Sequence, residues 1–430
     1  MADQLDFDQQ VAKNLRWNFS VNVMDLAFYS LASNLVSQAT VMPLLVSQLT
    51  TSKLAIGLIP AIFSLGFLLP QLLTANFTEG LRRKLPFVML ISGPGERGPY
   101  LAIGLVLWWL AVPHPALTLA LFFVLLAVAA VSAGVATPAW ADLIAKVIPL
   151  QGRGLWAGTA YGLGAILGMG GAALAGAMLG GFPFSKNFAL CFLGAAVAQV
   201  FSWIGLALNR EPAGQIVKPR VTLGDYLRQL PRVLRQDANY VHYLVSRSIA
   251  NLGGMAAGFL MVYGVGRFGF SGAEVAIVTA ILAGSQAVLN PLWGLLGDRL
   301  GNKAVLSGTA FSMLLATASA VVASSPIGLY VAFGLLGAAR AADSVGSMNI
   351  AMEFGAPEDR PTYIGLTNTL LAPAATLAPI IGGVLATLVG YQGMFGVAIA
   401  LAALGGLMMM LWVREPRHFG ERQPLVATTP

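Results

Sequence analysis

Six ionisable side chains lie inside long apolar stretches of this sequence, where a charge is costly. They are Asp25, Glu96, Arg97, Arg247, Arg340 and Asp343. A charged residue at the centre of a membrane-spanning helix costs roughly 2.5–3.5 kcal/mol on insertion scales, so each one needs a partner or a purpose. Buried acids can cycle a proton, and an arginine fork can bind a carboxylate or a phosphate. We therefore take these residues as candidates for substrate or proton binding.

Asp25 lies eight residues after Trp17, about 12 Å into the membrane at the rise of an α-helix. Polar residues at helical spacing form one stripe with it: Asn18, Asn22, Tyr29 and Ser33. When the two halves of the chain are aligned, Asp25 maps onto Ser246, beside Arg247. The Asp25–Arg247 pair could join the halves structurally. Together with Asn251 it could instead bind a substrate or a proton and break during a transport cycle.

Arg340 and Asp343 are three residues apart and can share one face of a helix. The aligned positions in the first half are Ala133 and Ala136. The fold therefore does not require charged residues at these positions in each half. Arg340 could bind an anionic substrate, or Asp343 could neutralise it. The substrate-binding prediction comprises Asn22, Asp25, Tyr29, Arg247, Asn251, Arg340 and Asp343.

Glu96 and Arg97 lie in the segment Gly93-Pro-Gly-Glu-Arg-Gly-Pro99. If a helix began at Tyr100, too few residues would remain to cross about 30 Å of hydrocarbon. The pair must therefore lie near mid-membrane, and the prolines and glycines predict a kink or an unwound turn. Adjacent residues point about 100° apart, so each charge needs its own partner, for which the first and second helices are the candidates. The pair could be structural or could take part in coupling. Asp25, Glu96 and Asp343 are the predicted proton-coupling groups.

The elements that hold these residues are membrane helices. Hydrophobic residues make up 57% and charged residues 10% of 430 positions, against about 25% charge in soluble domains. Apolar runs predict an all-α integral membrane protein of twelve helices. The first six lie near 17–46, 54–78, 85–112, 116–141, 155–180 and 188–208. The second six lie near 239–266, 273–297, 303–323, 327–353, 362–388 and 391–413.

The basic residues predict the orientation. With a cytoplasmic N-terminus, 19 of the 25 Lys and Arg residues lie inside, three lie outside and three fall within helices. This bias places both termini in the cytoplasm. The net charge of +7 is thus a topology signal, and we expect no nucleic-acid partner. We also read no removable signal peptide.

Internal sequence repeats predict two six-helix bundles, at 1–208 and 238–430. A cytoplasmic linker, 209–237, joins them, and its residues 226–235 are predicted to form a basic amphipathic helix. Asn18 recurs as Asn239, and Glu79–Lys84 recurs as Asp298–Lys303. Asp142, Arg153 and Gly158 recur as Asn349, Arg360 and Gly365, with both internal spacings preserved. Ordered echoes of this kind are typical of parallel repeats.

A short polar turn, Gly294-Leu-Leu-Gly-Asp298-Arg299-Leu-Gly301-Asn302-Lys303, separates the apolar runs 272–297 and 304–323. It resembles the helix 2–3 loop signature of the major facilitator superfamily, Gly-x-x-x-Asp-Arg/Lys-x-Gly-x-Arg/Lys, in the corresponding loop of the second half. The first-half copy is degraded, with Ala75 and Glu79 at signature positions. The resemblance covers about 17–413. It implies two pseudo-symmetric bundles that alternate access to a central site, and a gating latch of Gly294, Asp298, Arg299, Gly301, Lys303, Arg153 and Arg360, with Asp298 near Arg153.

These observations predict a secondary active transporter that moves a small organic solute, with H⁺ as the coupling ion. A lipid or lysolipid transporter, or a drug efflux pump, on the same fold stays an alternative. We expect a monomer in a bacterial cytoplasmic (inner) membrane, in contact with the lipid bilayer. No Cys/His spacing indicates a metal, and no nucleophile or phosphate-loop signature is present. We therefore expect neither a cofactor nor an enzymatic activity.

Overall fold

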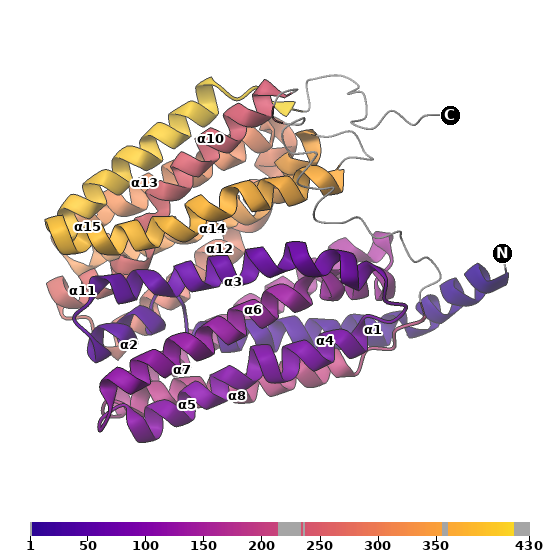
Figure 1. The fold of residues 1–430 in the computed structure, drawn as a ribbon, viewed down its shortest axis with the longest axis horizontal. Helices are drawn as coiled ribbons and strands as arrows, with labels where there is room; N and C mark the ends of the chain where they lie inside the picture. Colours follow the sequence, from indigo (N-terminus) through magenta and orange to yellow (C-terminus); the bar gives the residue numbers. More distant parts are fainter. Residues whose placement is uncertain (1, 214–233, 235–236, 355–359, 417–430) are drawn as a thin grey trace. The chain divides into compact units, whose positions relative to one another are not determined.

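The computed structural model describes residues 2–213, 234, 237–354 and 360–416, and this part of the chain is helical without strands (Figure 1). The helices of the first half are α1 (Ala2–Leu35), α2 (Val41–Leu49), α3 (Lys53–Glu79), α4 (Leu85–Ile91), η1 (Ser92–Arg97), α5 (Gly98–Leu110), α6 (Pro115–Val147), α7 (Leu150–Gly181) and α8 (Lys186–Ala207). Those of the second half are α10 (Ala238–Gly253), η2 (Gly254–Phe259), α11 (Leu260–Phe268), α12 (Gly272–Leu300), α13 (Asn302–Val322), α14 (Pro326–Phe354) and α15 (Arg360–Leu411).

The helices have the lengths and composition of membrane spans. Within the described residues, 8 helical stretches are long and apolar enough to cross a membrane. Counting the interrupted helices as single spans, and α15 as two, gives the predicted 12. The division of α15 falls at Gly390, whose φ of 75° and ψ of 176° are non-helical and open only to glycine. The all-α membrane fold is confirmed.

The described residues form two compact units. Unit 1 holds 2–51, 62–213 and 270–280. Unit 2 holds 52–61, 234, 237–269, 281–354 and 360–416. Each unit therefore includes a short segment from the other half of the chain. The predicted amphipathic helix at 226–235 and most of the predicted linker lie outside the described residues.

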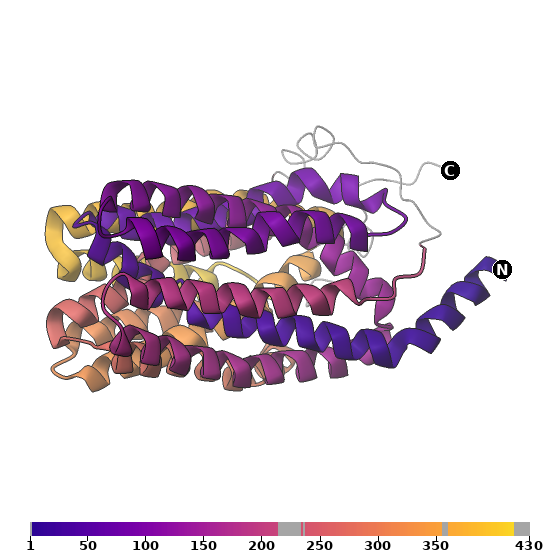
Figure 2. The same ribbon diagram turned by 90° about the horizontal axis from the view of Figure 1, so that it is seen from below.

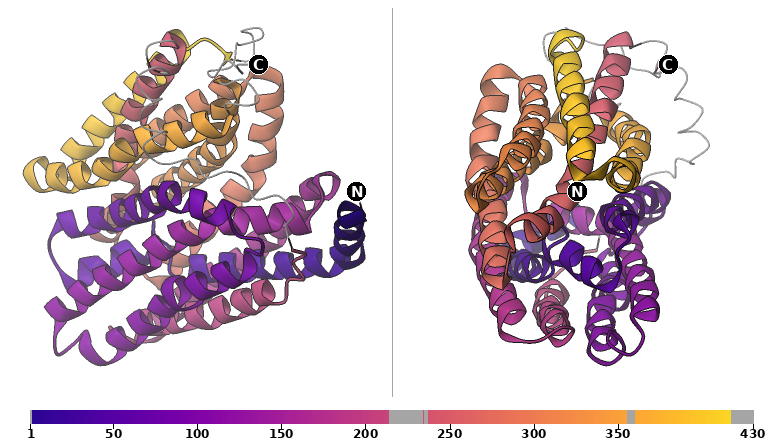
Figure 3. Two further views of the ribbon diagram at one scale, coloured as in Figure 1. Left: turned by 45° about the vertical axis from the view of Figure 1, so that its right-hand side comes forward. Right: turned by 90° about the vertical axis from the view of Figure 1, so that its left-hand side faces the viewer.

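In unit 1, α1 packs chiefly against α7 and α8, and α5 packs against α6 and α8. The helices of this unit run side by side in the indigo-to-magenta part of Figure 3. A buried apolar cluster joins five of them, with Val23 on α1, Val88 on α4, Leu143 on α6, Trp156 on α7 and Leu206 on α8. This packing positions α1, η1 and α8 around the charged residues described below.

The first predicted helix, 17–46, is wrong at its end. Figure 2 shows α1 as one continuous indigo helix from the N-terminus, and it ends at Leu35. The chain then turns through residues 36–40, and α2 begins at Val41. Pro43 lies in the first turn of α2, where its missing N–H leaves no helical hydrogen bond unmade. The apolar run is continuous in composition, but the helix is not.

The predicted kink at Gly93–Pro99 is confirmed. Residues Ser92–Arg97 form a π-helical segment, η1, between α4 and α5. Pro94 has no N–H to donate to the α-helical pattern, and a π-bulge absorbs the defect without ending the helix. The glycines on either side of Pro94 also let neighbouring helices approach, because a Cβ on Gly95 would lie 2.9 Å from the Cβ of Ser132.

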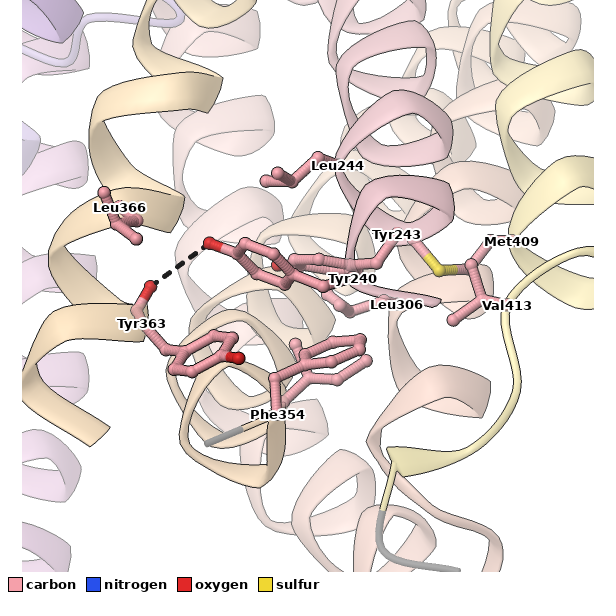
Figure 4. Close-up of a cluster of buried hydrophobic side chains, with 10 residues drawn as sticks. Tyr240, Tyr243, Leu244, Leu306, Phe354, Tyr363, Leu366, Met409 and Val413 are labelled. Atoms are coloured by element: carbon pink, nitrogen blue, oxygen red, sulfur yellow. Dashed lines mark hydrogen bonds between the residues drawn. The ribbon is translucent and has the colours of Figure 1, made fainter. Parts of the chain in front are cut away.

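Unit 2 is built around an aromatic core. Tyr240 and Tyr243 on α10 stack on each other, with ring centroids 6.2 Å apart, and both contact Phe354 at the end of α14. Figure 4 shows this cluster and the hydrogen bond from the Tyr240 hydroxyl to the backbone oxygen of Tyr363, 3.4 Å long. The same hydroxyl lies 2.9 Å from Thr367 Oγ1. The core therefore joins α10, α14 and the start of α15.

Candidate functional site

The π-helical segment η1 places Glu96 and Arg97 in one buried cluster. Their side chains are 9% and 8% exposed. The sequence predicts a separate partner for each, but Arg97 Nη1 donates to Glu96 Oε2 over 3.2 Å. The wider turn of a π-helix changes the angle between consecutive side chains, so the expectation from α-helical geometry was wrong.

Arg97 also joins α1 to α8. Its Nη2 donates to Ser202 Oγ over 2.9 Å and to Asp25 Oδ1 over 3.4 Å. The Ser202 hydroxyl donates in turn to the same oxygen of Asp25, 2.6 Å away. Asp25 is 4% exposed and Ser202 is fully buried. Arg97, Asp25 and Ser202 thus form a closed triangle in the interior of unit 1.

A cavity of about 190 Å³ adjoins this cluster. Its lining includes Asp25, Tyr29, Glu96, Arg97 and Trp140, with apolar side chains around them. Tyr29 adjoins the Glu96 carboxylate, and Trp140 adjoins Asp25. The predicted proton-coupling residues Asp25 and Glu96 and the predicted substrate contact Tyr29 therefore lie together at one cavity.

The cluster contains two carboxylates and one guanidinium. With all three ionised, it carries one negative charge more than positive in a region with little water to solvate it. An uncompensated buried charge is costly. A proton taken up by Asp25 or Glu96 makes the cluster neutral. The arrangement can therefore bind and release a proton.

The predicted site residues of unit 2 form a second, smaller group. Arg247 Nη2 on α10 forms an ion pair with Asp343 Oδ1 on α14. Ser347 donates to the same carboxylate over 2.9 Å and accepts from Arg247 over 3.2 Å. Arg247 is 5% exposed, whereas 46% of the Asp343 side chain is exposed. This triangle of arginine, aspartate and serine repeats the one in unit 1.

Asp25 and Arg247 therefore each have a charged partner within their own unit. The sequence instead suggested a pair between these two residues, because they lie at similar depth on symmetry-related helices. Asp343 pairs with Arg247 and not with Arg340 on its own helix. The Arg340 side chain is exposed and has no ion pair among the described residues. Asn251 lies one turn after Arg247 on α10 and is half-buried.

Asn22 has structural partners in the described part of unit 1. Its Nδ2 donates to Asn209 Oδ1 over 2.6 Å and to the Asn18 backbone oxygen over 2.7 Å, and its Oδ1 accepts from Asn209 Nδ2 over 3.1 Å. The side chain is 1% exposed. Its amide therefore ties α1 to the end of α8. A role for Asn22 in substrate binding stays a prediction.

The Gly294–Lys303 segment is mostly helical, contrary to the predicted polar turn. Gly294, Asp298 and Arg299 lie in the last turns of α12, and Gly301 alone forms the turn to α13. Gly301 has φ 93°, and the Glu415 carboxylate occupies the place that a Cβ would take. The same carboxylate accepts from the backbone N–H of Lys303 over 3.2 Å. Glycine is required here both by conformation and by space.

The other predicted latch residues are placed as follows. Arg153, near the start of α7, donates to the backbone oxygens of Ile148 and Ala145 over 3.0 and 2.7 Å. It thereby satisfies carbonyl groups at the end of α6. Arg360 begins α15, but its side chain lies outside the described part. The predicted approach of Asp298 to Arg153 joins the two units and stays a prediction.

Sequence reasoning missed a repeated tripeptide, Arg-Glu-Pro, that forms the same polar contacts at the end of each half. Arg210-Glu-Pro and Arg414-Glu-Pro follow the last helix of each half. Asn18 exchanges hydrogen bonds with the backbone of Arg210, at 2.9 and 3.2 Å, and Asn239 does the same with Arg414, at 2.7 and 2.8 Å. The repeated tripeptide was a usable signal. In each half it binds the asparagine of the Asn18–Asn239 repeat.

The glutamates of these tripeptides hold the amino-terminal ends of two helices. Glu211 accepts from the backbone N–H groups of Lys84 and Leu85, both at 2.8 Å, and pairs with Lys146 at 2.9 Å. Glu415 accepts in the same way from Lys303. A carboxylate is favourable at a helix N-terminus, where backbone N–H groups lack partners. In both halves, therefore, a glutamate that follows the last helix binds backbone N–H groups at the start of another helix of the same half.

Comparison with known structures identifies the class of fold. The chain is similar to a bacterial homolog of the human lysosomal transporter Spinster in an inward-facing, unoccupied conformation, with TM-score 0.66, 14% identity and coverage of 95% of this chain and 97% of that one. It is similar to a D-xylose–proton symporter (0.64, 14%, 96% and 99%) and to the nucleoside transporter NupG (0.60, 12%, 91% and 98%). A search of curated proteins gives no match. The fold is that of these membrane transporters.

A family model matches the second half of the sequence. The family model described as "Major Facilitator Superfamily" matches residues 243–428. The match covers 186 of the 430 residues, all of them in the second half of the chain. The protein is a multi-pass membrane protein.

Proposed function

We propose that this protein is a secondary active transporter that moves a small organic solute by alternating access and couples the movement to protons. The observation that carries the proposal is the cluster of Asp25, Glu96 and Arg97 beside a cavity of about 190 Å³. One guanidinium cannot neutralise two buried carboxylates. Uptake of a proton removes the remaining charge, and its release restores it.

The hydrogen bonds around Arg97 link proton binding to helix movement. Arg97 holds α1 through Asp25 and α8 through Ser202. When Asp25 is protonated, it no longer attracts the guanidinium as a charge, and the bond between η1 and α1 weakens. Protonation therefore changes the contacts between three helices of unit 1, as a coupled transporter requires.

Close contacts at the starts of α3 and α12 support alternating access. Within unit 2, Gly57 and Gly383 let α3 approach α15 so closely that an added Cβ would meet backbone atoms. Within unit 1, Gly176 and Gly272 do the same for α7 and α12. Lys53 adds a hydrogen bond to the Ala386 backbone oxygen, 2.7 Å long. By the charge bias these ends lie outside, and we propose that the contacts open when the site faces outward.

Proton binding can be tested before the solute is known. Infrared difference spectra of the purified protein between pH 5 and 8 should show the C=O stretch of a buried protonated carboxyl. Asp25→Asn or Glu96→Gln should remove that band. Asp142→Asn, at a half-exposed acid of unit 1, serves as the matched control and should keep it. An unchanged band in both cluster variants would refute the proposal.

A further inference from the structure

The middle of unit 2 carries one more positive than negative charge. Across the described residues of α10, α12 and α14, the charged side chains away from the helix ends are Arg247, Arg340 and Asp343. Asp343 forms an ion pair with Arg247. Arg340 has no ion pair or hydrogen bond with any described residue. An unpaired charge within a membrane span is costly, and this cost favours the binding of an anion at Arg340.

Arg340 is exposed on the side of α14 that faces between α10 and α12. Asp343, three residues later, contacts α10, and the Ser344 hydroxyl, four residues later, donates to Asn290 Oδ1 on α12 over 3.0 Å. At about 100° per residue, Arg340 points between these two directions. Val331, an exposed apolar residue nine positions earlier, points to the opposite side of the helix. Arg340 therefore lies on the polar side of α14, away from the side that exposes apolar residues.

Two carboxamides on α12 lie on either side of the level of Arg340. The backbone of Gln286 packs against Gly337, and Asn290 is hydrogen-bonded to Ser344. Arg340 lies between Gly337 and Ser344 along α14. Because the Ser344 hydroxyl donates to Asn290 Oδ1, the Asn290 amide presents its N–H groups as the remaining polar function, and these have no partner among the described residues.

A third carboxamide reaches the same level from α10. The start of α10 packs on the end of α14 in the aromatic core, so the two helices run antiparallel. Arg247 on α10 is level with Asp343 and Ser347 on α14. Asn251, one turn further along α10, is therefore level with Arg340. Its side chain is half-buried. Amide groups from both neighbouring helices thus flank the guanidinium.

The charges and donors define the chemistry of the ligand. The planar fork of an arginine matches the two oxygens of a carboxylate, and the charged hydrogen bonds that result are strong. One negative charge brings the sum over Arg247, Arg340 and Asp343 to zero. A dianion would leave an excess negative charge beside Asp343, and a neutral solute would leave Arg340 uncompensated. A single carboxylate fits best.

From this geometry we propose that the transported solute is an organic monocarboxylate, whose carboxylate binds the Arg340 guanidinium and accepts a hydrogen bond from the Asn290 amide. Asp343 neutralises Arg247 and so leaves Arg340 available. Asn251 and Gln286 bind polar groups on the rest of the solute. This inference rests on the transport function proposed above and names its substrate class.

Arginine modification by phenylglyoxal tests the carboxylate site. The full-length protein in lipid nanodiscs is treated with the reagent, and modified arginines are identified by peptide mass spectrometry. Arg340 is exposed and should react, whereas Arg247, which is 5% exposed and ion-paired, should not. Acetate, the smallest probe with this headgroup, should protect Arg340, and acetamide at equal ionic strength should not. Arg82 and Arg83, exposed in unit 1, are internal controls that acetate should leave reactive.

Two variants complete the experiment. Asn290→Ala removes one donor and should raise the acetate concentration that half-protects Arg340 about three- to tenfold, the usual net worth of a hydrogen bond. Asn349→Ala is the matched control, because this exposed amide lies on α14 nine residues from Arg340, on the opposite side. It should leave that concentration unchanged. An unreactive Arg340, equal protection by acetamide, stronger protection by the dianion sulfate, or unchanged protection in Asn290→Ala would overturn the proposal.

Protection is measured without a pH gradient and is therefore independent of proton coupling. Failure of protection with the infrared band of the unit 1 carboxyl groups intact would refute the substrate class alone. Loss of that band with protection intact would refute the coupling proposal alone.

Discussion

Replacing Arg97 by methionine tests whether the unit 1 cluster is held by charge. The substitution keeps a long apolar side chain but removes the partner of Asp25, 3.4 Å away, and of Glu96, 3.2 Å away. Breaking a buried ion pair by removing one partner costs about 3–5 kcal/mol. A second estimate agrees, because protonating an ordinary carboxyl group at pH 7 costs about 4 kcal/mol.

The second estimate also predicts a pH dependence for Arg97→Met. Two buried carboxylates without a cation must bind protons for the variant to fold. The folded variant then binds more protons than its unfolded state, so its stability falls as the pH rises. At pH 5 the same protonation costs about 1.4 kcal/mol per group, and the loss should be correspondingly smaller.

The single cysteine offers an assay for this stability. Cys191 is a free, fully buried thiol on α8, the helix that also carries Ser202. A fluorogenic maleimide should therefore react with it only when unit 1 unfolds. We expect Arg97→Met to unfold at lower temperature than the native protein, with a much larger difference at pH 8 than at pH 5.

A charge-free cluster is the control. Adding Asp25→Asn and Glu96→Gln to Arg97→Met leaves no uncompensated charge, and neutral replacement of a buried ion pair is often tolerated. This triple variant should recover most of the stability and lose the pH dependence. If the single and triple variants are equally destabilised at both pH values, Arg97 acts through packing and the charge argument is wrong.

Two further predictions concern the segment that ends α12. Gly301→Ala should destabilise the protein by about 1–3 kcal/mol, because alanine is strained at φ 93° and would displace the Glu415 carboxylate. Gly294→Ala, inside α12 where nothing lies within 4 Å of an added Cβ, should not destabilise it. Thermal unfolding followed by intrinsic tryptophan fluorescence compares the two variants. Asp298→Asn should shift the conformational balance more than Glu79→Gln, because the first-half loop signature is degraded; cysteine cross-linking across the cytoplasmic face measures this, and equal shifts would contradict a one-sided latch.

Composition and apolar run length were enough to predict most of the fold. The predicted helix 54–78 is found as Lys53–Glu79, and 327–353 as Pro326–Phe354, because a membrane helix must satisfy its own backbone hydrogen bonds over a fixed thickness. The prolines and glycines of 93–99 also gave the break within the third span. The break after Leu35 was missed because residues 36–46 are as apolar as the helix before them.

The partners of the buried charges could not be predicted from sequence. Helical rise gives the depth of Asp25 but not which neighbouring helix its face meets. Depth suggested Arg247 as the partner of Asp25, whereas the packing within unit 1 brings Arg97 to it instead. Ser202 gave no signal, because a serine in an apolar helix is ordinary. The Arg-Glu-Pro repeat shows that some tertiary information was present and overlooked.

Solute uptake by the Asp25→Asn variant tests the proposed coupling of transport to protons most directly. A thermal-shift screen of sugars, carboxylates, amino acids, lipids and drugs at two pH values first identifies a solute. The protein is then reconstituted in liposomes, and accumulation driven by a pH gradient is compared with solute exchange at equal pH. We predict that Asp25→Asn abolishes gradient-driven accumulation and retains exchange. Unchanged gradient-driven accumulation in this variant would contradict the account.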